Sequence, residues 1–230
     1  MEINADVGEM TGADGDVMPF ISIGNIACGG HASDREHMVE TVRLALACGV
    51  KVSAHPGYAD VENFGRVSVE MNRSELIVLV RSQVSLLKEV CDEEGAILSA
   101  IKPHGALYHD MMHDERVREV MINVASEFNV PLVVQAMRSD AVNLCCGSSF
   151  IREVFADRGY RVNGELMARS EAGALLTDPE MIVRQAKLVM TENMVICNDG
   201  SEISLAADTI CFHGDNPASV MALKILSNED

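Results

Sequence analysis

Short apolar segments recur along the chain, and most lead into a polar loop that a helical stretch follows. Strands are predicted at residues 2–5, 50–55, 97–102, 130–134, 150–156 and 208–213, with weaker candidates at 194–197 and 202–206. Helices are predicted at residues 34–48, 73–94, 114–128, 178–191 and from about 216. This alternation favours an α/β fold with a mostly parallel sheet. Both a closed or nearly closed barrel and an open doubly wound sheet fit it.

The longest predicted helix, residues 73–94, shows the signals behind these assignments. Its apolar residues recur every three or four positions, as expected for one buried helix face. Asn72 or Ser74 can cap its start, and Gly95 ends it. The chain is long enough for one sizeable core, so we predict a single domain over residues 1–230.

Charge restricts the partners of this chain. Eighteen Lys and Arg residues against 35 Asp and Glu residues give a formal net charge of −17. A field of this sign repels nucleic-acid phosphates and anionic lipids, so we expect no nucleic acid and no membrane as partner. A small anionic substrate would need a local positive group to overcome the same field.

Cysteine usage and the start of the chain indicate a cytoplasmic protein. The segment MEINADVGEM lacks the basic and apolar regions of a signal peptide, and no apolar run reaches membrane-spanning length. The seven cysteines are odd in number, form no CxxC motif and include the adjacent Cys145 and Cys146. Free, mostly buried thiols fit this pattern better than a disulfide framework.

Four histidines lie in similar loop contexts directly after predicted strands or Gly-rich turns. They are His31 in GGH, His55 in AHP, His104 in KPH and His213 in HGD. The carboxyl ends of parallel barrel strands face one side, where barrel active sites form. One such histidine is usually a structural residue, but four in equivalent positions predict a shared site. The remaining histidines, His37, His109 and His113, fit ordinary surface or helix positions.

Other polar residues follow the same strand ends. Asn4 and Asp6 follow the first strand, and Asp6 is a general base, a metal ligand or a turn cap. Lys102 precedes a proline at a strand end, which favours a grip on an anion or oxyanion over a solvated role. Asn25 and Cys28 lie in the predicted Gly-rich loop NIACGGH.

Two charged residues near later strand ends complete the predicted site. Arg158 either pairs with Asp157 or points inward, where a guanidinium would clamp a carboxylate with two hydrogen bonds. Asp215 would orient His213 or His104, as carboxylates orient imidazoles in many sites.

The residue types leave the cofactor open. Asp together with several histidines is compatible with a divalent metal. A nucleophilic Cys28 is less favoured, because its apolar neighbours indicate a packed thiol. The chain contains no GxxxxGK[ST] or GxGxxG motif, so no ATP or dinucleotide site is recognisable.

Seven ordered motifs resemble the LamB/YcsF family across nearly the whole chain. They are NADVGE, NIACGGHASD, AHPGYAD with NFGR, IKPHGALYH, EVFADRGY, GELMARSEAGAL and CFHGD. The resemblance implies an irregular (β/α) barrel of the glycoside hydrolase/deacetylase type. It also implies ATP-dependent opening of 5-oxo-L-proline to L-glutamate, performed with 5-oxoprolinase subunits B and C. ATP would then be used mainly at those partner subunits.

Within that activity the resemblance suggests roles for the predicted site residues. Asp6 or His104 would activate water, and Lys102 and His213 would stabilise charge on oxygen. The substrate carboxylate and ring would be held by Arg158 and Asn25, with Asn4, His31 and His55 as the other substrate-binding residues. Asp215 would belong to the catalytic group.

Three features depart from the family pattern. Ser33 replaces the more usual glycine in HASD, Val67 replaces a second basic residue after NFGR, and the stretch between Met137 and Phe150 is short. The alternatives to the lactam hydrolase role are a stand-alone metal-dependent deacetylase or carbohydrate hydrolase, and a non-catalytic lactam-binding subunit.

Overall fold

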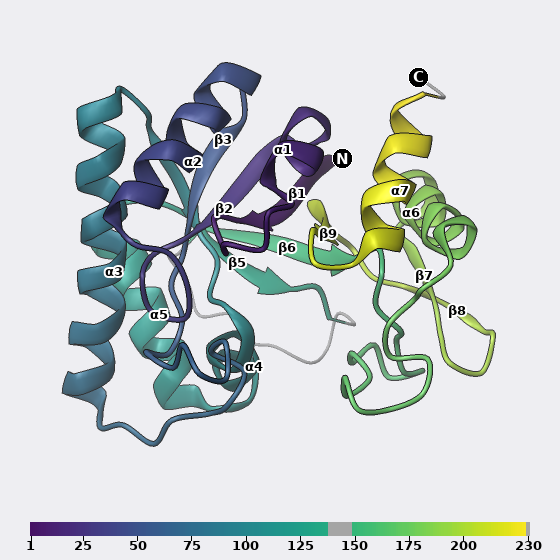
Figure 1. Ribbon diagram of the computed structural model, residues 1–230. Coiled ribbons are helices and arrows are strands. Elements are labelled where there is room, and N and C mark those ends of the chain that lie inside the picture. Colours follow the sequence, from purple (N-terminus) through teal and green to yellow (C-terminus); the bar gives the residue numbers. More distant parts are fainter. Residues whose placement is uncertain (138–148, 229–230) are drawn as a thin grey trace.

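Seven parallel strands close into a barrel in the computed structural model, which describes residues 1–137 and 149–228 (Figure 1). The strand order around the barrel is β1-β2-β3-β4-β5-β6-β9, and β9 pairs with both β6 and β1. These strands are β1 (Glu2–Val7), β2 (Ile23–Ala27), β3 (Lys51–His55), β4 (Leu98–Ile101), β5 (Leu132–Gln135), β6 (Phe150–Phe155) and β9 (Thr209–His213). The predicted barrel is confirmed, and the open doubly wound alternative is wrong.

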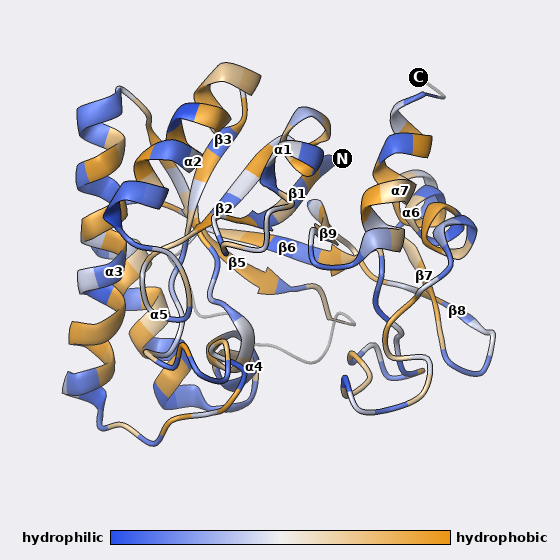
Figure 2. Ribbon diagram, viewed as in Figure 1, coloured by the Kyte–Doolittle hydropathy of each residue, from blue (hydrophilic) through white to orange (hydrophobic). Residues whose placement is uncertain are grey.

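Helices cover the outside of this barrel. They are α1 (Asp14–Val17), α2 (Arg35–Cys48), α3 (Arg73–Glu94), α4 (Gly105–His113), α5 (Glu115–Glu127), α6 (Pro179–Glu192) and α7 (Pro217–Ser227), with a 3-10 helix η1 (Met18–Phe20) after α1. Helices α2, α3 and α5 lie side by side on one flank, and α6 and α7 pack together on the other (Figure 1). Hydrophobic and hydrophilic positions alternate along the helices, as expected for elements with one buried face (Figure 2).

The start and stop signals of α3 act as the sequence predicts. The Asn72 side chain accepts a hydrogen bond from the backbone of Glu75, and the Glu75 side chain accepts one from the backbone of Asn72. Gly95 then ends the helix in the left-handed conformation, with φ of 77°. Ser74, the other cap considered, lies inside the helix.

Two elements differ from the sequence-based expectation. Residues 25–31 are predicted as a Gly-rich loop, but residues 25–27 belong to strand β2, in which Gly24 and Asn25 are unusual strand residues. A side chain at Gly24 would meet Val7 at 3.2 Å, so the glycine permits close packing of β2 against β1. Helix α4 begins directly after His104 without a side-chain cap, which left no start signal to read.

The two weaker strand candidates are not part of the barrel. Strands β7 (Met194–Ile196) and β8 (Glu202–Ser204) form a separate antiparallel pair between α6 and β9. Within the described residues they pair with each other and with no barrel strand, so they contribute no position to the barrel.

Five of the seven cysteines lie in the described residues. Cys28, Cys48, Cys91 and Cys211 are free thiols, and Cys48 alone among these four is exposed. Cys145 and Cys146 lie outside the described residues. Within residues 1–137 and 149–228, no helix combines the length and apolar character required to cross a bilayer.

Two buried glutamines join the outer helices to loops at the carboxyl end of the barrel. Gln83 of α3 accepts a hydrogen bond from Gly57 N at 3.0 Å and donates one to Gly57 O at 2.7 Å. Gln185 of α6 donates to the carbonyls of Phe155, Ala156 and Arg158 at 2.9–3.1 Å. Each glutamine therefore fixes a loop that follows a barrel strand.

Replacing Gln83 with leucine should destabilise the fold strongly. The Gln83→Leu variant leaves the buried N–H and C=O of Gly57 without partners, and each such group costs about 1–3 kcal/mol. We therefore expect the free energy of unfolding, measured by urea denaturation, to fall by about 2 kcal/mol or more. The control is Ser82→Ala on the exposed face of α3, and equal losses in the two variants would contradict this anchoring role.

Candidate active site

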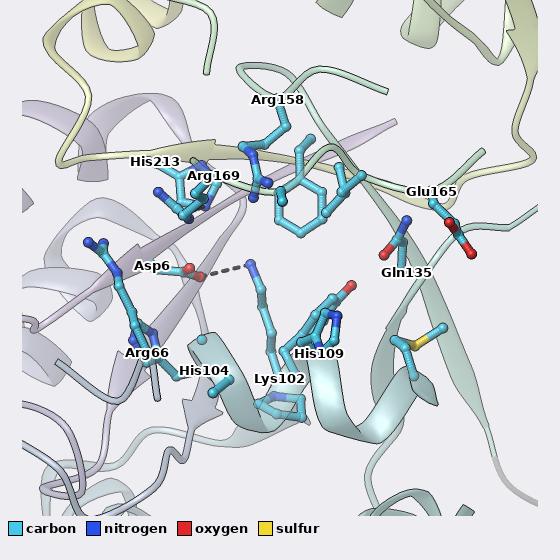
Figure 3. Close-up of a pocket in the computed structure, with 18 of the residues that line it drawn as sticks. Asp6, Arg66, Lys102, His104, His109, Gln135, Arg158, Glu165, Arg169 and His213 are labelled. Atoms are coloured by element: carbon cyan, nitrogen blue, oxygen red, sulfur yellow. Dashed lines mark hydrogen bonds and ion pairs between the residues drawn. The ribbon is translucent and has the colours of Figure 1, made fainter. Parts of the chain in front are cut away.

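A cavity of about 480 Å³ opens at the carboxyl ends of the barrel strands (Figure 3). Its lining includes seven of the ten predicted site residues: Asp6, His55, Lys102, His104, Arg158, His213 and Asp215. Asn4, Asn25 and His31 do not line it and lie buried behind the lining residues. Strand register explains part of this convergence, because Asp6 is aligned with Asn25 on one side and with His213 on the other.

A buried ion pair between Asp6 and Lys102 lies at the base of the cavity. Lys102 Nζ is 2.8 Å from Asp6 Oδ1, the contact drawn as a dashed line in Figure 3. Asn25 donates to the same carboxylate oxygen at 3.0 Å, and Asn4 Oδ1 accepts from Lys102 at 3.3 Å. The two asparagines therefore position the ion pair from below.

The ionised forms dominate in this pair. Burial raises the pKa of Asp6, but the charges of His55 and Lys102 outweigh it and hold that pKa well below its usual range. Burial likewise lowers the pKa of Lys102, yet the nearby Asp6 carboxylate brings it well above its ordinary value. A fixed negative and a fixed positive charge thus face the same cavity.

Glu153 is a third member of this buried charge group, and sequence reasoning missed it. It is fully buried on β6, and its Oε1 is 2.8 Å from Lys102 Nζ. Among the described residues, neither Glu153 oxygen has the geometry of a hydrogen bond, so proximity to the ammonium balances its charge. Glu153 lies between Arg152 and Val154 in the sequence, a context that gives no signal of its burial.

Glu9, also missed, gathers three of the predicted histidines. Its Oε1 lies 3.1 Å from His31 Nε2, 3.0 Å from His104 Nδ1 and 3.7 Å from His55 Nε2. His55 Nε2 and His104 Nδ1 are 3.0 Å apart. The signal was present in NADVGE, where Glu9 follows Asp6 by three residues, just after strand β1.

Burial determines the charge state of this group, which we call the Glu9 cluster (Glu9, His31, His55 and His104). Desolvation lowers the pKa of His31 to about 4 and also lowers the pKa of His104. Burial alone would raise the pKa of Glu9, but hydrogen bonds with His104 and His31 bring it below its usual range. The cluster therefore combines an ionised carboxylate with neutral imidazoles at His31 and His104. One glutamate and three histidines that offer ligand atoms within 4.8 Å of one another form a possible metal-binding site.

His213 pairs with Asp157, which corrects the role expected of Asp215. Its Nδ1 is 2.7 Å from the fully buried Asp157, whereas Asp215 forms an ion pair with Arg66 at 2.9 Å. The expectation that Asp215 orients His213 or His104 is wrong, because Asp215 lies beyond Gly214 and turns toward the partly exposed rim. A buried Asp157 at the end of the adjacent strand takes that place.

Arg158 lies in the cavity and does not pair with Asp157. Its Nε donates to Ala174 O at 3.1 Å and its Nη2 donates to Met167 O at 2.8 Å. Burial lowers the pKa of Arg158 to about 10, so the side chain stays cationic at neutral pH. Because main-chain carbonyls hold the guanidinium, its charge is available for an anionic ligand.

Further arginines surround the cavity in a protein of strongly negative net charge. Arg66, Arg161 and Arg169 join Arg158 in its lining, and Figure 3 shows Arg158 and Arg169 beside His213. Arg169 Nη2 is 3.4 Å from His213 Nε2. Arg66 is paired with Asp215 and Arg161 with Glu171, so Arg158 and Arg169 supply the local positive charge that an anionic small molecule would require.

Cys28 has no nucleophilic character in this structure. Its thiol is buried and donates to Ile26 O, and burial raises its pKa to about 12. His109 and His113, expected as ordinary positions, lie four residues apart on α4 with ring centroids 4.2 Å apart, and both line the outer part of the cavity.

Comparison with known proteins decides the family. The LamB/YcsF family model matches residues 1–229. The chain belongs to the LamB/YcsF family. A relative from Vibrio cholerae serotype O1, named as the A subunit of 5-oxoprolinase, is 42% identical over 229 residues, covering 96% of this chain and 93% of the relative. A relative of the same name from Symbiobacterium thermophilum is 37% identical over 237 residues, covering 100% and 91%.

A solved structure of similar sequence agrees with the fold described above. The lactam utilization protein from Thermus thermophilus superimposes with a TM-score of 0.90 at 34% identity, covering 100% of this chain and 96% of that protein. The barrel architecture is therefore shared with a protein of similar sequence.

Two departures from the LamB/YcsF pattern differ in structural consequence. Ser33 has φ of 76°, the left-handed region that favours the more usual glycine, so serine is strained here. Val67 is 51% exposed, and its side chain needs no buried partner. The third, the short stretch after Met137, lies mostly outside the described residues.

Removing the Asp157 carboxylate should lower the pKa of His213. Burial lowers that pKa, but the Asp157 charge and hydrogen bond raise it above its usual value of about 6.5. A raised pKa contributes stability that is fully present below about pH 6.5 and disappears as pH rises through the folded-state value. In Asp157→Asn we expect a lower His213 pKa by NMR titration and a smaller free energy of unfolding at acid pH.

The matched control for this titration is Asp215→Asn. Asp215 is two residues from His213 in the sequence, but it pairs with Arg66, so its removal should leave the His213 pKa close to the wild-type value. A His213 pKa that does not move in Asp157→Asn would contradict the pairing.

Proposed function

We propose that this chain is the A subunit of 5-oxoprolinase and acts with subunits B and C in the ATP-dependent hydrolysis of 5-oxo-L-proline to L-glutamate. The observation that carries the proposal is the near full-length similarity to relatives named as the A subunit of 5-oxoprolinase, at 37–42% identity. The lactam utilization protein of similar fold supports the same substrate class.

The cavity suits a small cyclic amide that bears a carboxylate. Its volume of about 480 Å³ lies within the range of about 300–1,000 Å³ typical of small-molecule sites. Arg158 would bind the substrate carboxylate with the guanidinium hydrogens that its two carbonyl partners leave free. The surrounding arginines would attract this anion against the negative charge of the whole protein.

Ring opening requires a base, a positive charge near the reacting oxygen and a proton for the departing nitrogen. Water oxygen bonds to the ring carbonyl carbon, the carbon–nitrogen bond breaks, and the nitrogen takes up a proton. His213 is suited to accept the water proton at Nε2 and return it to the nitrogen, because Asp157 fixes its Nδ1. Lys102 would supply positive charge for the developing oxyanion.

These roles modify the expectation that Asp6 or His104 is the base. The low pKa of Asp6 makes it a weak proton acceptor, and we assign it to holding Lys102. His104 directs Nδ1 at Glu9 and donates Nε2–H to Phe64 O, which leaves neither nitrogen for the substrate. Asn4 and Asn25 support the Asp6–Lys102 pair instead of contacting the substrate.

ATP fits the partner subunits better than this chain. The sequence has no nucleotide-binding motif of the glycine-rich type, and the proposal routes no step of the phosphate chemistry through the residues described here. The cytoplasmic location remains a prediction and agrees with the use of ATP.

Turnover by the assembled complex tests the assigned residues. The assay combines this chain with its B and C subunits, ATP and 5-oxo-L-proline and measures glutamate. Lys102→Met should lower kcat by about 100-fold or more, as expected for loss of a charge-stabilising group. Arg158→Gln should raise KM by about 10-fold or more, because a charged hydrogen-bonding partner of the carboxylate is lost.

Arg152→Gln is the matched control, since Arg152 is a partly exposed arginine on β6 that pairs with Asp208 away from the cavity. Absence of glutamate with wild-type protein and ATP-hydrolysing partners would overturn the proposal. Undiminished turnover in Lys102→Met and His213→Gln would favour the non-catalytic lactam-binding role. Acetate release from acetylated sugars by the isolated chain would favour the deacetylase.

A further inference from the structure

Four potential ligand atoms converge on one point below the cavity, and they come from four different segments of the chain. They are Glu9 Oε1, His31 Nε2, His55 Nε2 and His104 Nδ1, all within 4.8 Å of one another. We propose that this Glu9 cluster binds one divalent transition-metal ion, for which zinc is the probe. The inference goes beyond the proposed function and does not depend on the substrate.

Backbone carbonyls determine which nitrogens face the centre without a hydrogen. His55 Nδ1 is 2.8 Å from Lys102 O, and His104 Nε2 is 2.9 Å from Phe64 O. A carbonyl only accepts, so both of these nitrogens carry a hydrogen, and in the tautomer with a single ring hydrogen the opposite nitrogen presents a lone pair. Metal-binding histidines characteristically donate their second nitrogen to a carbonyl in this way.

The resulting contact is unfavourable without a cation or an additional proton. The lone pairs of His55 Nε2 and His104 Nδ1 face each other at 3.0 Å, and the Glu9 carboxylate lies 3.0 Å from the latter. One proton can lie between only two of these three atoms. A metal ion at their centre satisfies all of them at once.

The distances of the histidine nitrogens from Glu9 suit tetrahedral coordination, and because the His31 and His104 rings are stacked with centroids 3.6 Å apart, binding by all four residues requires one of these two rings to turn. Zn–N and Zn–O bonds of about 2.0–2.2 Å place ligands on a tetrahedron about 3.3–3.6 Å apart. The distances from Glu9 Oε1 to the three histidine nitrogens are 3.0–3.7 Å. His31 has no hydrogen-bond partner for Nδ1 among the described residues, so nothing there prevents its Nε2 from presenting a lone pair.

Charge balance supports a divalent ion at this place. The buried carboxylates of Asp6, Glu9 and Glu153 face the single ammonium of Lys102, which leaves two negative charges when all are ionised. Asp6 Oδ2 is 3.4 Å from His55 Nε2, so the cluster adjoins the Asp6–Lys102 pair. An isolated buried charge is costly, and a divalent cation would remove this excess.

A second group, formed by Asp6, Cys211 and His213, is a poorer metal site. Lys102 Nζ lies 2.8 Å from the Asp6 carboxylate and 3.2 Å from Cys211 Sγ, so an ammonium already occupies the space between them. The Glu9 cluster has no such internal cation, and Glu9, His55 and His104 also line the cavity, which gives an ion a route of entry.

Metal stoichiometry and affinity test the proposal without an activity measurement. Untagged protein is stripped with a chelator, titrated with Zn²⁺ or Co²⁺, desalted and examined by elemental analysis, visible absorption of Co²⁺ and thermal unfolding. Wild type should bind one equivalent and unfold at higher temperature with metal. Glu9→Gln and His31→Gln should weaken binding by about 100-fold or more, since changes to outer-shell partners alone cost about 10–100-fold.

The matched control is the double variant His109→Gln/His113→Gln, which removes a histidine pair at helical spacing on α4 outside the cluster. It should retain one equivalent and the wild-type Co²⁺ spectrum. Circular dichroism and unfolding of the metal-free variants establish that each one folds. Wild-type protein that retains no metal would overturn the proposal. In that case a proton shared between two atoms of the Glu9 cluster would take the place of the ion. The proposal would also be overturned by folded Glu9→Gln and His31→Gln proteins with unchanged affinity, or by loss of metal in the double variant alone.

Discussion

The Asp6–Lys102–Glu153 charge group is the constraint on which the carboxyl end of the barrel depends. Lys102 and Glu153 are almost completely buried, and each charge would be costly without the others. These residues come from β1, the end of β4 and β6, so the group requires the barrel to close in this strand order. The cavity and both histidine groups are arranged around it.

Two kinds of histidine site surround that charge group. His213 pairs with a buried carboxylate and keeps Nε2 directed at the cavity, where proton transfer is possible. His31, His55 and His104 turn their nitrogens toward Glu9 and away from a substrate. Four histidines with similar sequence contexts therefore divide into one suited to acid–base chemistry and three suited to binding a cation.

Much of the architecture could be predicted from sequence because the signals are local. Capping residues, glycines and apolar spacing located α2, α3, α5 and α6 to within a few residues, and polar residues at strand ends located the site. The local sequence does not determine whether a side chain points into the barrel or toward solvent. Glu153 and Asp157 act through strand β6 and its end, and nothing in FIREVFAD distinguishes their inward direction from that of a solvated acid.

The same limit applies to pairing across the barrel. Asp215 is close to His213 in sequence, which suggested the wrong partner, whereas Asp157 reaches His213 only because β6 and β9 are adjacent. Asn25 is predicted in the Gly-rich loop NIACGGH but lies in strand β2, where it meets Asp6 of β1. Family resemblance gave the order of the motifs, but the closing of β9 onto β1 decides which of their residues meet.

Gln83 and Gln185 connect the outer helices α3 and α6 to the loops beside the cavity through side-chain hydrogen bonds. A small displacement of α3 against the barrel would act through two hydrogen bonds on Gly57. The loop that follows His55 would move with it. A displacement of α6 would move the segment from Phe155 to Arg158 in the same way. A protein that docks on either helix, far from the cavity opening, could thus adjust the position of one wall without touching a reacting group.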